Sequence, residues 1–245
     1  MRALGLASVL VASVASFAWG QDAVKTLPES YKLQFENEWV KIVRVHYEPL
    51  ARLPAHTHTE LATAYVYLND SGPVIFKHIG ADYGPATRPP TKAGGFRLYR
   101  GLEELHEVEN TSPLPSDFLR VEFKTDPKDP KSLRGKFFRE SYPAGENFEK
   151  IQFENVQVRI TRLVVAPGRS LDLSALSAEP TLLVALSNAR VEVARTKVPA
   201  QVALTPGKER WLDAGQREQL RNVGADAAEF LRFEFKTAPR VPPTQ

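Results

Sequence analysis

Apolar and polar side chains alternate along many short stretches of the chain. Between Val43 and Glu48 every second residue is apolar, and the runs AYVYL, PVIF, FRLY and FLRVEF are separated by segments rich in Gly, Pro, Asn and Asp. A period of two is typical of strands with one buried face, and helical periodicity is weak throughout. The pattern predicts an all-β protein. Closed or double-sheet architectures are those in which such strands avoid exposed edges.

Two of these stretches occur twice, in the same order. KLQFENEWVKIVRVHYEPL at residues 32–50 matches KIQFENVQVRITRLVVAPG at residues 150–168. FLRVEFKT at residues 118–125 matches FLRFEFKT at residues 230–237. Self-similarity of this kind indicates an internal duplication, in which each copy is one structural unit.

The matches divide the chain into two units and a connection. We expect the first β unit at residues 31–125 and the second at residues 149–239. Residues 126–148, DPKDPKSLRGKFFRESYPAGENF, are rich in charged and turn-forming side chains. Such a composition between two periodic segments predicts a linker.

The first residues follow a different pattern from the rest of the chain. Arg2 precedes an uncharged, largely apolar run over residues 3–17, which Ala18-Trp19-Gly20 follows. This is the layout of a secretory signal peptide with cleavage after Gly20. The apolar run is shorter than the ~20 residues that a membrane-spanning helix needs. We therefore expect residues 1–20 to be removed, and the rest to be periplasmic or secreted without a membrane anchor.

Charge and cysteine content exclude several classes of function. The chain has 32 basic and 29 acidic residues, a net charge of +3 and no cysteine. Basic and acidic residues are interspersed and form no aromatic-basic stripe, so we expect no nucleic-acid partner. Without cysteine there is no disulfide and no thiol nucleophile. Neither a Gly-x-Ser-x-Gly motif nor a glycine-rich phosphate loop is present.

The histidines are the main candidates for chemistry. The chain has five of them, and His56 and His58 are one residue apart at the start of a predicted strand. On a strand this spacing directs both side chains to one face, which Glu60 shares by parity. A metal site and a pair of ordinary polar side chains both remain open. We expect His46 to face solvent and His78 to lie on the surface at a strand end.

These residues resemble the motifs of the cupin superfamily. The first motif is roughly a glycine, five residues, His-x-His, three or four residues, and Glu; here Leu50 takes the glycine position and His56 and His58 fall into place. The second motif ends in a histidine that is followed, after three residues, by an asparagine. His106 and Asn110 have this spacing. With its duplication, the chain resembles a bicupin, which has two tandem jelly-roll barrels.

The resemblance implies one divalent transition metal in the first barrel: Fe, Zn, Mn, Ni or Cu. Its implied ligands are His56, His58 and His106. The chain departs from the family pattern at the glutamate, because Ala62 and Thr63 stand where the family has it. Glu60 is the nearest acid, so we expect it to be a fourth ligand or a hydrogen-bond partner of a ligand imidazole.

The second copy lacks the motif histidines. Gly168 is present, but Ser174 and Leu176 replace the His-x-His pair. Glu218 stands in place of the last histidine, and Asn222 is retained. We interpret the second unit as a degenerate, structural repeat.

Three functions are consistent with the sequence. The resemblance favours a metal-dependent enzyme with an oxygenase-like reaction on a small organic substrate, because three-His iron sites occur among cupin oxygenases. The alternatives are a non-enzymatic protein that binds a small molecule, a sugar or a metal, and a purely structural module. The cupin fold hosts many chemistries, so the fold does not decide among them. Two packed cupin units already form a dimer-like body, so we expect a monomer or a homodimer.

Overall fold

The chain folds into β-sheets with very little helix, as the alternating pattern predicted. The computed structural model describes residues 22–80, 84–102, 104–173, 178–194, 198–216 and 218–240. Its helical elements are α1 (Ala23–Thr26) and the 3-10 turn η1 (Pro130–Ser132). Among the described residues, no helix is long and apolar enough to cross a membrane. The predicted signal peptide, residues 1–20, lies outside the described residues.

The first unit contains two antiparallel sheets. The larger has the strand order β1-β2-β9-β4-β7-β10, and the smaller has the order β3-β8-β5-β6. The strands of the larger sheet are β1 (Tyr31–Glu36), β2 (Val40–Tyr47), β4 (Thr63–Tyr67), β7 (Phe96–Tyr99), β9 (Ser116–Phe123) and β10 (Gly135–Phe137). Those of the smaller sheet are β3 (Arg52–Thr57), β5 (Val74–His78), β6 (Ala86–Arg88) and β8 (Leu105–Asn110).

The second unit repeats this plan. One sheet has the order β11-β12-β19-β14-β17, and the other has the order β13-β18-β15-β16. The first of these is built from β11 (Phe148–Glu154), β12 (Val158–Val165), β14 (Thr181–Ala185), β17 (Glu209–Leu212) and β19 (Ala228–Phe235). The other is built from β13 (Ser170–Asp172), β15 (Ala189–Ala194), β16 (Ala200–Leu204) and β18 (Gln219–Asn222). Each unit is therefore a jelly-roll barrel made of two facing sheets.

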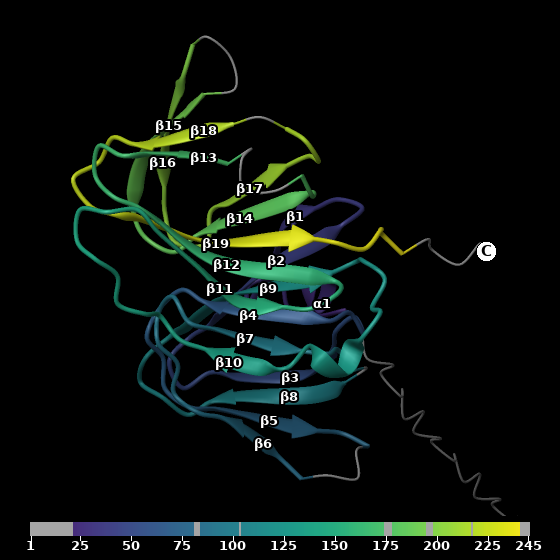
Figure 1. Ribbon diagram of the computed structural model, residues 1–245. Coiled ribbons are helices and arrows are strands. Elements are labelled where there is room, and N and C mark those ends of the chain that lie inside the picture. The colour runs from purple at the N-terminus through teal and green to yellow at the C-terminus, as the bar shows by residue number, and fades with distance from the viewer. Residues whose placement is uncertain are drawn as a thin grey trace, which may run out of the picture.

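The four sheets are stacked in layers, with the two larger sheets in the middle (Figure 1). The first barrel encloses an apolar core to which β2 contributes Val43 and Val45 and β8 contributes Val108. A separate core lies between the barrels, where Ile42 of β2 and Ile160 of β12 belong to one buried cluster. β2 is thus apolar on both faces over part of its length, because one face lines its own barrel and the other packs on the second barrel.

Irregularities of the backbone recur in both units. The ladder between β1 and β2 shifts register between Leu33 and Phe35. The ladder between β11 and β12 shifts at the matching place, between Ile151 and Phe153. A β-bulge changes the local twist of a strand and is kept among related units. The two bulges at matching positions therefore agree with an internal duplication.

The turn after β2 has the same unusual backbone in both copies. Leu50 has φ of 58°, and Gly168 at the matching position has φ of 74°. Left-handed backbone is natural for glycine and strained for a residue with a Cβ. Leu50 therefore keeps the turn that the glycine of the cupin motif forms, at some cost in stability.

The predicted linker contains structure of its own. Within residues 126–148, β10 adds to the edge of the first unit's larger sheet by pairing with β7. Phe137 stacks on Phe96, with ring centroids 4.5 Å apart, whereas Phe138 is 67% exposed. One phenylalanine therefore anchors the connection to the first barrel.

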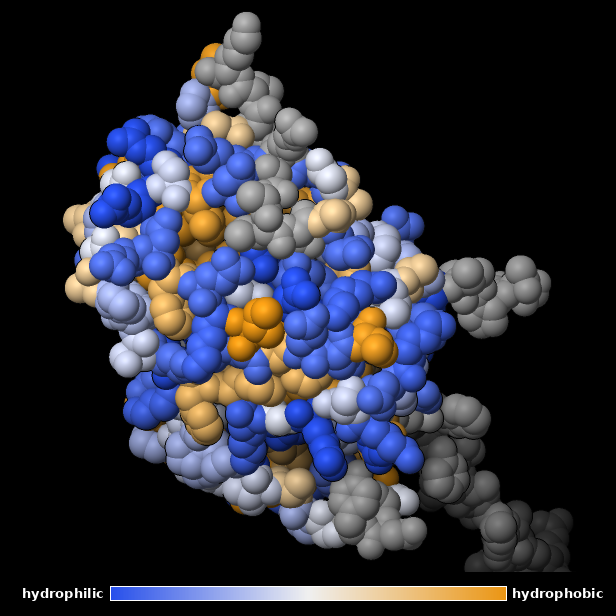
Figure 2. All heavy atoms as spheres, viewed as in Figure 1, coloured by the Kyte–Doolittle hydropathy of each residue, from blue (hydrophilic) through white to orange (hydrophobic). Residues whose placement is uncertain are grey.

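Hydrophilic residues predominate on the face seen in Figure 2, and hydrophobic residues lie in groups among them. Large apolar side chains that are exposed include Leu33 on β1 and its counterpart Ile151 on β11, each 49% exposed. Exposed apolar side chains are normal at a protein surface.

Candidate metal centre

Three histidines occupy one row across the adjoining strands β3, β8 and β5. His56 is paired in register with His106, and His106 is paired with His78. Residues directly opposite each other on antiparallel strands project from the same face. The imidazoles therefore meet, with ring centroids 4.9 Å apart for His56 and His106 and 5.7 Å apart for His78 and His106.

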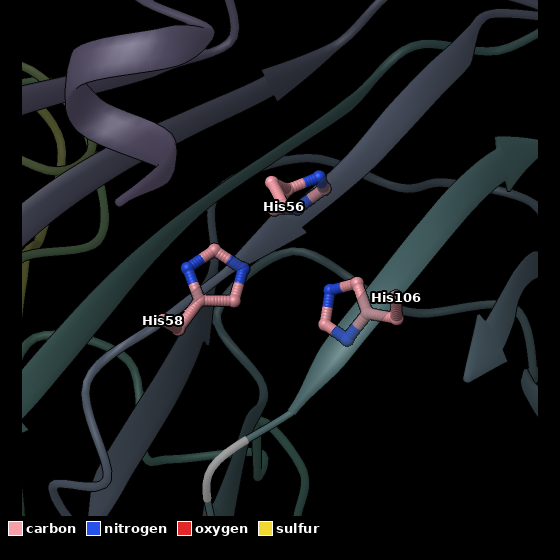
Figure 3. A group of neighbouring side chains, drawn as sticks. All are labelled: His56, His58 and His106. Carbon is pink, nitrogen blue, oxygen red and sulfur yellow. The ribbon is translucent and has the colours of Figure 1, made fainter. Parts of the chain in front are cut away.

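His58 completes a compact cluster just beyond the end of β3. Potential ligand atoms of His56, His58 and His106 all lie within 4.8 Å of one another. The three rings gather around a common point (Figure 3). His56 is fully buried and His106 is 3% exposed. The structure thus brings together the three histidines that the motif spacing selected.

The environment keeps His56 and His58 neutral at physiological pH. Burial lowers the pKa of His56 to about 4. Burial, followed by the positive charge of Arg120, also lowers the pKa of His58 well below its ordinary value. A metal ligand has to be an unprotonated imidazole, so these shifts favour the binding form.

A backbone contact fixes which nitrogen of His56 is basic. Nδ1 lies 2.8 Å from the carbonyl oxygen of Pro54, so Nδ1–H donates and Nε2 carries the lone pair. Nε2 lies 2.9 Å from the hydroxyl of Tyr31, which therefore donates to it. The Tyr31 hydroxyl is in turn 2.8 Å from that of Tyr47. Ligand histidines in metalloproteins are commonly oriented through the nitrogen that does not bind the metal.

His106 supplies the observation that tests whether these residues fit a metal. Among the described residues, neither ring nitrogen of His106 has a hydrogen-bond partner, although the side chain is buried. Buried polar atoms are nearly always paired, and an exception calls for an explanation such as an ion. Three clustered imidazoles, with an unpaired nitrogen among them, fit a first-row divalent metal.

Glu104, which the sequence analysis did not select, lies beside His106. Its Oε2 is 3.5 Å from Nδ1 of His106 and 3.8 Å from Nε2 of His78. The Tyr99 hydroxyl donates to Oε1. Burial opposes ionisation of this carboxyl, but contact with His106 and the hydrogen bond from Tyr99 outweigh it and lower the pKa to about 2. Glu104 is therefore a carboxylate.

Glu104 also belongs to a second group of potential ligands. Ligand atoms of His78, Glu104 and His106 lie within 4.8 Å of one another. The two groups share His106, the middle residue of the histidine row. The sequence contains little signal for Glu104, because it precedes β8 (Leu105–Asn110) and strand parity does not apply to it.

Two expectations for single residues change with the structure. Glu60 is exposed, in the bend after β3, and it is absent from both ligand groups found among the described residues. The parity argument for it does not apply, because β3 ends at Thr57. The expectation for His78 was wrong: its side chain is 7% exposed and lines a cavity. His46 is 38% exposed, as expected of a residue on the outer face.

The histidines open into a cavity of about 280 Å³ inside the first barrel. At about 30 Å³ for each water molecule, this space holds about nine waters or one small organic molecule. His58, His106 and Glu104 line it, together with Tyr65 and several other aromatic side chains. An apolar pocket with a few converging polar groups is the usual form of a small-molecule site.

No family model and no curated protein matches the sequence. Solved structures do resemble this one. One is a cupin 2 conserved barrel domain protein from Leptotrichia buccalis, which is 13% identical with a TM-score of 0.52, over 84% of this chain and 88% of that chain. A salicylate 1,2-dioxygenase from Pseudoaminobacter salicylatoxidans, in adducts with gentisate, is 9% identical with a TM-score of 0.55, over 81% of this chain and 68% of that chain. The chain has the bicupin fold.

The same fold is present in proteins of quite different names. A vicilin from Capsicum annuum is 12% identical with a TM-score of 0.55, over 82% of this chain and 76% of that chain. At such identities the likeness establishes the architecture of this bicupin and leaves its activity to be argued from the site.

Asn110 of the cupin motif has a structural role. Its Nδ2 donates to the carbonyl oxygens of Glu48 and Leu114, and its Oδ1 accepts from the backbone N–H of Ser112. Asn222 makes a similar set of contacts in the second barrel: Nδ2 donates to the carbonyl oxygens of Val165 and Asp226, and Oδ1 accepts from the N–H of Gly224. These contacts tie the end of β8 to the turn after β2 and so hold His106 in place.

The second cupin barrel carries an ion pair where the first carries His106. Glu218 is buried and accepts two hydrogen bonds from Arg210, from Nε to Oε1 and from Nη2 to Oε2. The cavity there is about 60 Å³ and is lined largely by aliphatic residues of β14, β15, β16 and β18. Ser174 and Leu176, which replace the first two histidines, lie outside the described residues.

Proposed function

We propose that this bicupin is a metal-dependent enzyme, with an oxygenase-like reaction on a small organic substrate in the first barrel. The supporting observation is the cluster of His56, His58 and His106 beside a cavity with aromatic walls inside the first barrel. A divalent transition metal held by three imidazoles keeps coordination positions for water and substrate and supplies Lewis-acid or redox chemistry.

Several residues orient the ligand histidines His56 and His106. The Pro54 carbonyl accepts from Nδ1 of His56 and so directs its basic Nε2 toward the centre. Glu104 faces Nδ1 of His106, which leaves the opposite nitrogen of that ring to bind. Tyr99 donates to Glu104 and fixes the carboxylate. Such partners of ligand histidines raise ligand basicity and metal affinity.

The rest of the cavity restricts what reaches the centre. Tyr65, Tyr67, Phe76 and Phe118 line it with aromatic surface. Aromatic walls exclude water and bind flat apolar groups. We propose further that the second barrel is a structural half, that residues 1–20 direct export, and that the protein acts in the periplasm or outside the cell.

Oxygen uptake tests the reaction class. The protein would be loaded anaerobically with Fe(II) and screened in an oxygen electrode against a panel of small organic molecules. We expect at least one compound to raise oxygen uptake, and we expect His106→Ala to abolish that increase. His46→Ala is the matched control, because it removes a histidine outside the cavity. An uptake that His106→Ala leaves unchanged would contradict the proposal.

One observation favours a second function, small-molecule binding without turnover. The hydroxyl of Tyr31 already occupies Nε2 of His56, so this part of the cluster is satisfied by protein groups. A binding protein would retain the cavity and its ligands but would show no conversion of the bound compound. Product analysis after incubation with each binding compound separates the two functions.

A further inference from the structure

Three arginines line the same cavity as the histidines: Arg88, Arg97 and Arg120. Arg120 is neutralised within the barrel, because its Nε donates to Glu122 at 3.0 Å. Among the described residues, neither Arg88 nor Arg97 forms an ion pair with a carboxylate. Charges inside proteins are normally paired, so the two unpaired guanidinium groups need an explanation.

Arg88 is held rigidly by neutral groups. It is 6% exposed, and its Nη2 donates to the hydroxyls of Ser71 and Ser116 at 3.2 Å and 2.8 Å. The guanidinium carbon lies 5.6 Å and 5.4 Å from the ring centroids of Tyr67 and Phe118. Its Nε has no hydrogen-bond partner among the described residues. The side chain is therefore fixed in position without a balancing negative charge.

Arg97 stands nearby on β7. Its guanidinium carbon lies 5.4 Å and 5.5 Å from the ring centroids of Tyr65 and Tyr99. Arg88 lies over Tyr67 and Arg97 lies over Tyr65, and these two residues of β4 line the same cavity. In keeping with this, burial and then the positive charge of Arg97 lower the pKa of Arg88. Two neighbouring cations in a cavity repel each other unless an anion lies between them.

The charged side chains of the cavity indicate what kind of ligand fits. Glu104, an acid in the described lining, lies against Tyr99, His106 and His78 and forms no ion pair with Arg88 or Arg97. An anion that enters the cavity can therefore pair with these two guanidinium groups. Guanidinium groups bind carboxylates through paired hydrogen bonds in one plane.

We propose that the first barrel binds a small organic carboxylate, with its carboxylate on Arg88 and Arg97 and its apolar body against the aromatic walls. This inference rests on the proposed function only in taking the cavity as the substrate site, since the arginines do not depend on a metal. It names the substrate class that the histidine cluster would act on.

Calorimetric titration of the full protein, after removal of metal with a chelator, tests the inference. The probes are benzoate, its neutral analogue benzamide, and inorganic phosphate. We expect benzoate to bind at least about tenfold more tightly than either of the others, because hydrogen bonds to charged groups contribute that much. Equal binding of benzamide or tighter binding of phosphate would overturn the inference.

Variants assign the binding to the arginines. Arg97→Met should weaken benzoate binding by about 10- to 100-fold, and Arg88→Lys, which keeps the charge but loses the planar fork, should weaken it as well. Arg52→Met, which removes an exposed cation from β3, is the control and should leave binding unchanged. If Arg88→Lys does not fold, the benzoate affinity of Arg97→Met alone tests whether the arginines bind the carboxylate. Unchanged benzoate affinity in Arg97→Met would overturn the inference.

The failure of this inference and that of the proposed function can be distinguished. If no metal binds to the parent but benzoate does, the enzyme proposal fails and the carboxylate site stands. If metal binds but benzoate binding does not depend on the arginines, the carboxylate site fails and the metal centre stands.

Discussion

The hydroxyl of Tyr31 donates a hydrogen bond of 2.9 Å to Nε2 of His56. That nitrogen is the basic one, because Nδ1 of the same ring donates to the Pro54 carbonyl. The hydroxyl therefore occupies the lone pair through which His56 would bind a metal. A metal bound at Nε2 has to displace the hydroxyl, so Tyr31 and the metal compete for one atom.

This competition predicts that Tyr31→Phe raises metal affinity. Loss of a neutral hydrogen bond of about 1 kcal/mol corresponds to about a fivefold lower dissociation constant. Titration with a metal-sensitive dye measures it. Tyr47→Phe is the control, because it removes the other partner of Tyr31 and leaves the contact with His56 in place. Weaker binding by Tyr31→Phe would show instead that the hydroxyl supports the bound metal.

Glu104→Gln should weaken metal binding by about 10- to 100-fold, since loss of a partner that orients a ligand histidine has an effect of that size. The substitution keeps the size of the side chain and removes its charge. Competition against a chelator of known affinity gives the dissociation constants. Glu107→Gln, an exposed position beside His106 on β8, should have no effect. Equal affinities for both variants would mean that Glu104 does not act on His106.

The metal-free protein should lose stability as the pH falls from about 6.5 to 4. Burial lowers the pKa of His56 from 6.5 to about 4, so in this window the unfolded chain binds a proton that the folded chain does not. The stabilisation is present above pH 6.5 and is lost toward pH 4, by at most about 3 kcal/mol for this histidine. Urea unfolding at several pH values measures it. His56→Ala should show a shallower pH dependence, and an identical one would refute the assignment.

The turn after β2 gives a prediction independent of any metal. Leu50 has φ of 58° where Gly168 has 74°, and left-handed backbone costs a non-glycine residue about 1–2 kcal/mol. Leu50→Gly should therefore raise the free energy of unfolding by about 1 kcal/mol, because the exposed side chain contributes little burial. The reciprocal change Gly168→Leu should lower it. Urea unfolding of both variants checks the pair, and a destabilised Leu50→Gly would contradict the account.

The fold could be predicted from the sequence because its signals are local. Alternation over residues 43–48 marks a strand, and the repeated segments mark two like units. The convergence of His56, His58 and His106 followed from motif spacing, which encodes the barrel topology through the family resemblance. These parts of the account needed no knowledge of which strands pair.

The site residues that the sequence did not predict correctly depend on how strands pair and where they end. His78 faces the cavity because β5 pairs with β8 in a register that sets it opposite His106, and no local pattern reveals that partner. Glu60 was selected by parity along a strand that ends at Thr57, before reaching it. Tyr31 reaches His56 from β1, a strand of the other sheet.

The central claim is that His56, His58 and His106 form a metal centre, and elemental mass spectrometry tests it most directly. The protein would be purified without a histidine tag and measured as isolated and after reconstitution with Zn, Fe, Mn, Ni and Cu. We predict one metal ion per chain in the parent and in His46→Ala, and none in His56→Ala/His58→Ala. A parent protein that holds none of these metals after reconstitution, or a double variant that retains them, would contradict the claim.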